Sequence, residues 1–329
     1  MRAVVVRAFG DYRQLCEEAF PAPAPGADEV LIDVHAAGVN FPDLLVVAGK
    51  YQILPRLPFV PGREVAGIVR AVGSGVTTCK AGDRVLAPVE HGAFAEQAVA
   101  PASGTFVIPD AMSLEAAAAF PVVYQTAYVA LAERARFLEG ETVLVTGAAG
   151  GVGLAAVQIA KALGATVLAA VSNAEKGALA RANGADHVID TSVPDLRNAL
   201  RDQVHAVTDG RGADVVLEQV GGDVFDAALR AVAWSGRIVV VGFAGGRIPE
   251  IKANYLLVKN ISATGLQISD YRTRMPEWTR RATGRVLEMV ARGQVCPRVM
   301  GRWPLGEVAQ AFDAIRSRSV QGKIVLTVS

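Results

Sequence analysis

The amino-acid sequence predicts an α/β protein that combines a β-rich domain with a doubly wound parallel sheet. Three observations lead to this prediction: short β-branched runs through residue 122, alternating strand and helix patterns over 123–265, and a glycine cluster at the first strand–helix junction. With 329 residues, of which 51% are hydrophobic, the chain is long enough for two separate cores.

The N-terminal segment, residues 1–122, has the composition of a domain made of short strands. Its β-branched runs, broken by Gly and Pro, cover 29–39, 65–76, 81–88 and 92–101. No long helical pattern separates these runs, which favours a barrel or a sandwich. Residues 266–329 are helical at first and end in the strand-like "GKIVLTV", and we expect them to complete this domain.

Residues 123–265 alternate between apolar strands and helical segments. The expected strands are 142–147, 166–171, 186–190, 213–220 and 237–243. The expected helices are 151–163, 174–183, 194–206 and 222–233. Short connections between such elements indicate a parallel sheet with helices on both faces, as in nucleotide-binding domains.

The first junction, "TGAAGGVG" at 146–153, indicates a site for a pyrophosphate. Free amides at the start of a helix, with the helix dipole behind them, bind anions. Gly150 and Gly151 let the backbone approach the phosphates, and Gly153 allows close helix–strand packing. The predicted contacts are Ala149, Gly150, Gly151, Val152 and Gly153. The alternative is a tight turn without a ligand.

The end of the second strand of this sheet bears on the identity of the dinucleotide. NAD-binding folds place Asp or Glu about 20 residues beyond the glycines, where it holds the ribose hydroxyls. This chain has Ser172 and Asn173 there, followed by Lys176, which favours the 2′-phosphate of NADPH. Alternatively, Ser172 and Glu175 form a helix capping box and Lys176 is a solvated helix residue.

Charge, hydropathy and cysteine usage argue against several classes of protein. The net charge of +1 gives no basic surface for nucleic acid or for an anionic membrane. No run of about 18 uncharged apolar residues indicates a membrane span, and the first residues lack a signal-peptide pattern. The three cysteines are scattered singly, without the spacing of a zinc site. We therefore expect a metal-free cytoplasmic protein.

Several motifs resemble those of one family. They are "AAGVNFPD" (36–43), "PFVPGREVAGIVRAVGSGV" (58–76), "AGDRV" (81–85), "TGAAGGVG" (146–153), "ANGADHVID" (182–190) and "SVQGKIVL" (319–326). Together they resemble the zinc-free medium-chain dehydrogenases/reductases of the quinone oxidoreductase, or zeta-crystallin-like, branch. The resemblance implies a GroES-like N-terminal domain, a Rossmann domain with strand order 3-2-1-4-5-6, and a cleft between them. It also implies a homodimer or tetramer that pairs edge strands near 261–268.

The resemblance further implies that the catalytic zinc of related alcohol dehydrogenases is absent. Where the zinc-dependent relatives have a cysteine and a histidine, this chain has Asn40 and Arg63. Glu64 remains, but one carboxylate does not complete a three-ligand catalytic site. Hydride transfer without a metal is therefore expected.

Candidate site residues follow from the same resemblance. The residues that match the nicotinamide end are Asn40, Thr126, Gly242 and Phe243. Arg318 matches an arginine that faces the cofactor, and Tyr51 matches a tyrosine of the substrate cleft. The catalytic candidates are Tyr51, Asn40 and Asp43, with Tyr51 or water as the proton donor.

Each candidate also has a structural interpretation. Asn40 and Asp43 follow a strand and could cap the next helix, whereas Thr126 and Tyr51 could simply pack. Gly242 could be a plain strand-end glycine, and Arg318 a solvated charge. Two positions, Leu45 and Thr191, lack aromatic side chains that some family members have, so substrate and adenine contacts must differ.

A metal-free site of this kind reduces electrophiles that are already activated. The expected function is NADPH-dependent reduction of quinones or other conjugated carbonyls. One alternative is C=C reduction of an acryloyl-CoA, another enoyl-CoA or a substituted acrylate, whose coenzyme A phosphates could meet a run of arginines. This run consists of Arg272, Arg274, Arg280, Arg281 and Arg285, which could equally be a solvated helix face. A second alternative is a non-catalytic, NADPH-binding crystallin-like or RNA-binding protein.

Overall fold

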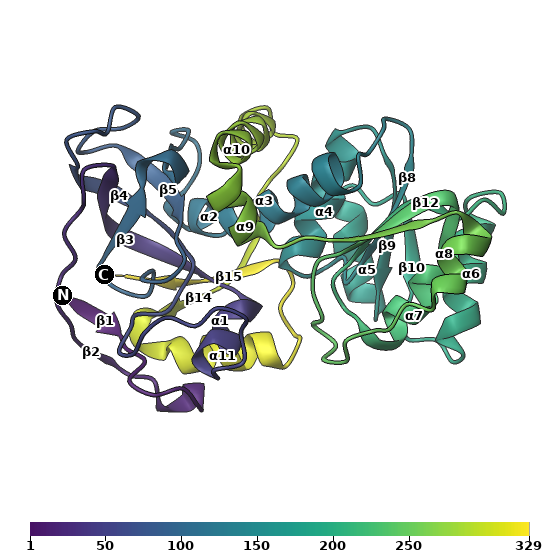
Figure 1. Cartoon of the computed structure of the whole chain (residues 1–329), viewed down its shortest axis with the longest axis horizontal. Helices are drawn as coiled ribbons and strands as arrows, with labels where there is room; N and C mark the ends of the chain where they lie inside the picture. The colour runs from purple at the N-terminus through teal and green to yellow at the C-terminus, as the bar shows by residue number, and fades with distance from the viewer. Residues whose placement is uncertain (329) are drawn as a thin grey trace. The chain divides into compact units, whose positions relative to one another are not determined.

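The computed structural model describes residues 1–328, which form two compact units (Figure 1). The first unit consists of Met1–Val122, Ser269–Thr283 and the segment from Pro297 onward. The second unit consists of Val123–Ile268 and Gly284–Cys296. Within the described part of the chain, no helix is both long and apolar enough to cross a membrane.

The first unit is built on a seven-stranded, mostly antiparallel sheet. Its strands are β3 (Glu29–Val39), β4 (Glu64–Val72), β5 (Arg84–Pro88), β6 (Gln97–Pro101), β7 (Phe106–Val107), β14 (Val299–Pro304) and β15 (Lys323–Thr327). The order is β14-β15-β3-β4-β5-β7, and β6 also pairs with β3. A separate two-stranded sheet joins β1 (Arg2–Val4) to β2 (Glu17–Ala19). Because β15 lies beside β3, the C-terminal strand completes the sheet of the N-terminal segment.

Most residues of the long strand β3 are buried, and only Asp33 and His35 interrupt the buried run after Val30. Val30, Ile32 and Val34 are buried and belong to the same core as Phe94 and Phe312. The helices of the first unit are α1 (Phe41–Val47), α2 (Leu114–Ala118), α9 (Ile268–Arg274), the first half of α10 (Pro276–Ala291) and α11 (Val308–Arg316). From Gly284 onward, α10 belongs to the second unit. Single 3-10 turns cover Tyr12–Gln14, Ala102–Gly104 and Leu305–Glu307.

The second unit contains a six-stranded, wholly parallel sheet. Its strands are β8 (Thr142–Thr146), β9 (Thr166–Val171), β10 (His187–Asp190), β11 (Ala213–Glu218), β12 (Val232–Val240) and β13 (Ser262–Gly265). The order is β10-β9-β8-β11-β12-β13. Counted from β8, this is 3-2-1-4-5-6, so the predicted Rossmann topology and α/β fold class are confirmed.

Helices connect the parallel strands, as the alternating pattern predicts. They are α3 (Pro121–Val129), continued by a π-helical turn (Ala130–Arg134), α4 (Gly151–Ala162), α5 (Ala174–Ala182), α6 (Leu196–Ala206), α7 (Gly222–Ala231) and α8 (Ala253–Lys259). One strand starts earlier than expected. The prediction was 237–243, but β12 begins at Val232, where the backbone turns extended directly after α7 and pairs with Ala213.

Residues 284–296 pack with the second unit, unlike Ser269–Thr283 and the segment from Pro297 onward. A buried amide on α4 attaches them. Gln158 accepts hydrogen bonds from the Tyr124 hydroxyl (2.9 Å) and the Cys296 amide (3.1 Å). Its Nε2 donates to the Cys296 carbonyl (3.0 Å) and to Oδ1 of Asn183 (2.6 Å). Because Gln158 is buried, these partners are required, and they tie the segment to the Rossmann sheet.

Candidate functional site

The glycine turn between β8 and α4 has the geometry of an anion site. Gly150 is the N-cap of α4 and no side chain caps the helix there, so its first amides have no intrahelical acceptor. A Cβ on Gly153 would lie 2.2 Å from the Gly147 carbonyl oxygen and 2.7 Å from Nε2 of Gln219, so only glycine fits. A Cβ on Gly150 would approach only the Gly147 oxygen, at 3.4 Å. Packing therefore does not require glycine at position 150, and the absence of a side chain there leaves room for a ligand to approach the backbone.

The other turn residues divide by burial. Ala149 is buried at 2% exposure, whereas Gly151 and Val152 form the first turn of α4 and remain partly exposed. Gly147, which the sequence prediction did not include, makes the turn itself with a φ of 57°. The glycine one position before the expected motif was the signal that could have identified it.

A buried carboxylate at the end of β11 braces this turn, and sequence reasoning missed it. Glu218 is fully buried and accepts from the Thr146 hydroxyl (3.1 Å) and from the amides of Val220 and Gly221 (both 2.9 Å). Gln219 donates its Nε2 to the Thr146 carbonyl at 2.6 Å. Burial raises the pKa of Glu218, and the three donors oppose that rise. The neighbouring strand ends are thereby locked together beneath the glycine turn.

At the end of β9, the structure places a polar, exposed surface without a strand-end carboxylate. Ser172 and Asn173 are exposed, and Lys176 is half-buried in the first turn of α5. The helix cap is Asn173, whose Oδ1 accepts from the Lys176 amide at 2.9 Å. The alternative of a Ser172 capping box is therefore wrong, because the helix starts one residue later.

The remaining cofactor candidates lie on separate elements. Thr126 is buried in α3, and Gly242 and Phe243 directly follow β12 with partial exposure. In the first unit, Arg318 is exposed after α11 and adopts a positive φ of 56°. Their contacts with a cofactor stay predictions.

In the first unit, polar residues on β3, β4 and β15 meet in a buried cluster. Lys323 is 5% exposed, and its Nζ donates to Oε1 of Glu64, to Oδ1 of Asn40 and to the Val39 carbonyl, each at 2.7 Å. The Asn40 amide Nδ2 donates to Glu64 at 2.8 Å. Glu64 is fully buried and also accepts from the Val122 amide at 2.7 Å. The orientation of the Asn40 side chain is therefore fixed at both ends.

Asp43, in the first turn of α1, is 1% exposed. Its Oδ2 accepts from the Asn40 amide at 2.8 Å, so it caps the helix. Within residues 1–328, its Oδ1 has no hydrogen-bond partner. Burial raises the pKa of Asp43 to about 7, although the positive charges of Arg63 and Lys323 lower it. The carboxyl therefore changes its charge near neutral pH.

Arg63 lies beside this cluster and contacts Tyr51, the proposed proton donor. Its guanidinium stacks over the Tyr51 ring, with the central carbon 4.9 Å from the ring centroid. Its Nη2 donates to Glu90 at 2.6 Å and to the hydroxyl of Ser269 at 3.3 Å. Arg272 approaches the same Glu90, at 3.9 Å. The three catalytic candidates and Arg63 thus belong to one compact unit.

These donors do not fit a catalytic zinc. Of the three positions compared with zinc ligands, Asn40, Arg63 and Glu64, only Glu64 is an anionic ligand type, and both its oxygens accept hydrogen bonds. The ammonium of Lys323 already balances its charge, and a guanidinium such as Arg63 has no lone pair to offer. Among the described residues, no group of three or more His, Cys, Asp or Glu side chains could hold a metal ion.

The arginines from 272 to 285 do not all lie on one charged face: only Arg281 and Arg285, four residues apart on α10, are exposed together. Arg272 is largely buried, and Arg280 stacks over Phe106 and donates to the Ser103 carbonyl at 2.9 Å. Arg274 is strongly exposed, and Arg285 approaches the hydroxyl of Tyr128 at 3.5 Å in the second unit. This dispersal gives no support to a shared phosphate site.

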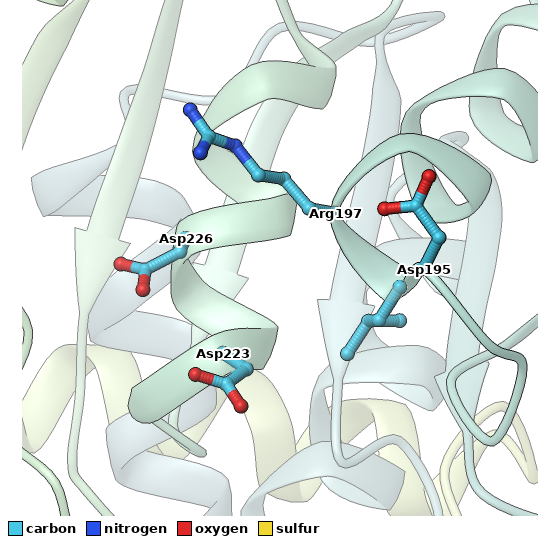
Figure 2. A pocket seen from close by; sticks show the side chains of 5 residues that line it. Asp195, Arg197, Asp223 and Asp226 are labelled. Carbon is cyan, nitrogen blue, oxygen red and sulfur yellow. The ribbon is translucent and has the colours of Figure 1, made fainter.

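Figure 2 shows an open pocket of about 270 Å³ at the starts of α6 and α7. Its lining residues are Asp195, Leu196, Arg197, Asp223 and Asp226. Two of its carboxylates are already engaged, because Arg247 donates to Asp223 at 2.9 Å and to Asp226 at 2.5 Å. The pocket contains none of the predicted site residues.

The antiparallel sheet of the first unit and the Rossmann sheet of the second are the fold of a medium-chain dehydrogenase/reductase. Two family models agree with this class. The alcohol dehydrogenase GroES-like domain matches residues 26–110, and the zinc-binding dehydrogenase model matches residues 151–283. The name of the second model refers to zinc, but Asn40, Arg63 and Glu64 of this chain do not fit a zinc ion.

Comparison with known proteins narrows the class. The chain is 42% identical to the quinone oxidoreductase-like protein 2 homolog of Nematostella vectensis, over 99% of this chain and 88% of the relative. A mycobacterial protein solved in complex with NADPH superposes with a TM-score of 0.92 at 35% identity, covering 100% of both chains. The Escherichia coli quinone oxidoreductase complexed with NADPH gives 0.89 at 30% identity, again covering 100% of both chains. The chain belongs to the quinone oxidoreductase family of medium-chain dehydrogenases/reductases.

Proposed function

We propose that this chain is an NADPH-dependent reductase of quinones or other conjugated carbonyls and works without a metal. The observation that carries the proposal is its similarity, in sequence and in structure, to quinone oxidoreductases, one of them solved with NADPH. The Asn40–Glu64–Lys323 cluster supports metal-free chemistry, because an ammonium stabilises Glu64 where a metal ion would need ligands.

The Rossmann unit supplies the groups that would hold NADPH. The uncapped amides at the start of α4 suit its pyrophosphate, and Ser172, Asn173 and Lys176 suit its 2′-phosphate. When bound, NADPH supplies a hydride. A titration should show NADPH binding at least about tenfold tighter than NADH, or about 1.4 kcal/mol. Lys176→Ala should reduce that preference and leave NADH nearly unchanged, whereas equal affinity for both cofactors in the parent protein would contradict the assignment.

The overall reaction is balanced by one hydride and one proton. A quinone becomes a hydroquinone, or an enone a saturated ketone, and NADP⁺ is released. The proton comes from Tyr51, whose ring stacks on the Arg63 guanidinium, or from water.

The decisive assay compares kcat/KM for 1,4-benzoquinone, a simple enone and acryloyl-CoA on one preparation. Quinone or enone turnover that survives a strong chelator is the expected result. A lead of about a hundredfold for acryloyl-CoA, or 2.7 kcal/mol, would reject the quinone assignment. Turnover of none of the three would reject the enzyme assignment altogether.

We further propose a homodimer that pairs the Rossmann units through β13. This strand ends the sheet, so one of its edges has unpaired backbone groups. The preceding helix α8 exposes Leu257 (78%) and Val258 (73%), as an interface would require. Light scattering should show a dimer that Val258→Glu dissociates, while Val107→Glu in the first unit leaves it intact. A monomeric parent protein at micromolar concentration would contradict this proposal.

A cytoplasmic location is also part of the proposal. Cys16, Cys79 and Cys296 are free thiols, as is usual for proteins of reducing compartments. Cell fractionation with immunodetection tests it, and recovery of the protein outside the cytosolic fraction would contradict it.

A further inference from the structure

Three contacts fix the side chain of Arg63, whereas an ordinary ion pair would provide one. Its side chain is buried, and contacts from three separate segments position it: the ring of Tyr51, the carboxylate of Glu90 and the hydroxyl of Ser269. An arginine side chain loses about 2 kcal/mol of rotamer freedom when it is fixed in this way. The protein orders this side chain without a ligand. Binding of a ligand group to Arg63 therefore causes no further loss of its rotamer freedom.

The donors that remain on Arg63 face accessible space. A guanidinium has five N–H groups, and all the hydrogen bonds of Arg63 within residues 1–328 run through Nη2. Neither Nε nor Nη1 is among the buried polar atoms that lack a partner in that range, so both keep access to solvent. Nη1 of a rigid, largely desolvated cation that stacks on the Tyr51 ring is thus available to a ligand.

The carboxylates around Arg63 neutralise its positive charge only in part. Glu90 is approached by two guanidiniums, Arg63 at 2.6 Å and Arg272 at 3.9 Å. Glu64 is already matched by Lys323. Burial alone would lower the pKa of Arg63, but Tyr51, Glu90 and Asp43 together raise it, so the guanidinium stays charged. The site therefore favours a ligand atom that carries or acquires negative charge.

We propose that Arg63 is a catalytic residue that donates from Nη1 to the carbonyl oxygen of the quinone or enone and stabilises the negative charge that forms there. This inference rests on the proposed function. Hydride addition forms one new bond to hydrogen, and the displaced π pair ends on the carbonyl oxygen. A proton from Tyr51 or water then neutralises that oxygen, and Arg63 keeps its own protons throughout. Fixed donors aimed at a developing oxyanion act in this way in many enzymes.

The test compares Arg63→Met and Arg63→Lys with the control Arg70→Met. Arg70 lies on the same strand, β4, but is exposed and pairs weakly with Asp33. Arg63→Met removes the donors, and its partner Glu90 is half-exposed and stays hydrated. We expect kcat for 1,4-benzoquinone to fall about 10²–10³-fold with Arg63→Met. Arg63→Lys keeps the charge but lacks the planar guanidinium that the Tyr51 ring and Glu90 hold in place, and should lose about tenfold. KM and the Kd for NADPH should change by less than about threefold, as expected for an interaction made in the transition state.

The outcomes separate this inference from the proposed function. A parent protein that reduces benzoquinone, together with an Arg63→Met variant whose kcat stays within about threefold, overturns the role of Arg63 and leaves the function standing. Equal losses in the Arg63 and Arg70 variants also overturn it. A parent protein that binds NADPH but reduces neither quinone nor enone overturns both. If Arg63→Met fails to fold, Arg63→Lys decides: unchanged kcat rejects the role.

Discussion

Replacing Lys323 by Met tests whether the stability of the buried cluster in the first unit depends on the ammonium group of Lys323. Lys323 contributes three hydrogen bonds of 2.7 Å, to Glu64, Asn40 and the Val39 carbonyl. Methionine has a similar length but no charge, so Glu64 would remain fully buried without its counter-ion. Removing one partner of a buried ion pair costs about 3–5 kcal/mol.

The structure places the expected loss near the middle of that range. Glu64 keeps two donors, the Asn40 amide and the Val122 amide, which moderates the cost. Against this, the Val39 carbonyl and the Asn40 oxygen each lose a donor. We therefore expect about 4 kcal/mol, which for a unit of this size lowers Tm by roughly 8–16 °C.

Calorimetry is the appropriate assay, because two compact units can unfold in separate transitions. Lys161→Met is the matched control: its ion pair with Asp186 is 2.6 Å long but about half-exposed, so its loss should cost at most about 1 kcal/mol. The double variant Lys323→Met/Glu64→Gln should be more stable than Lys323→Met alone, because it removes the orphaned charge. Equal losses in the Lys323 and Lys161 variants, or a strictly additive double variant, would refute the reasoning.

Three further predictions follow from the site. Gly153→Ala should destabilise the Rossmann unit, whereas Gly150→Ala should keep its Tm but weaken NADPH binding; the reverse pattern in calorimetry and titration would contradict the roles assigned to the two glycines. Because burial raises the pKa of Asp43 from 3.8 to about 7, its stabilising contribution is full below about pH 4 and is lost as pH rises through about 7. The Tm of Asp43→Asn should therefore improve relative to the parent as pH rises across that window, and a constant difference would count against it. Gln158→Leu should loosen residues 284–296, seen as faster amide exchange there and not in the first unit.

The Rossmann unit could be predicted almost completely because its signals are local. Most strands and helices are encoded in runs of consecutive residues, and their alternation predicts a parallel sheet. The strand order was implied by the family resemblance, and α8 was not predicted. The errors arose where one run allows two conformations. The segment that follows α7 continues a helical pattern, yet Val232 is already extended and pairs with β11. Similarly, the predicted phosphate contacts begin at Ala149, whereas the residue that makes the turn is Gly147.

The sequence predicted only some members of the buried cluster in the first unit. Asn40 and Glu64 were singled out by resemblance, but Lys323 was not, because its contacts join residues up to 284 positions apart. Sheet register supplies the missing step. Val39 lies opposite Ile324 and Ala37 opposite Val65, so the next positions bring Asn40 beside Lys323, and Glu64 beside Gly38.

Gly38 then leaves the room that Glu64 needs. A Cβ there would lie 2.3 Å from Oε1 of Glu64. A lysine in the apolar run "GKIVL" and a glutamate at the start of β4 are each costly to bury alone. Once the order β15-β3-β4 is known, only their pairing relieves that cost. Arg63, the residue before Glu64, is thereby carried to the edge of the same cluster, where Glu90 and Ser269 hold it with its remaining donors accessible.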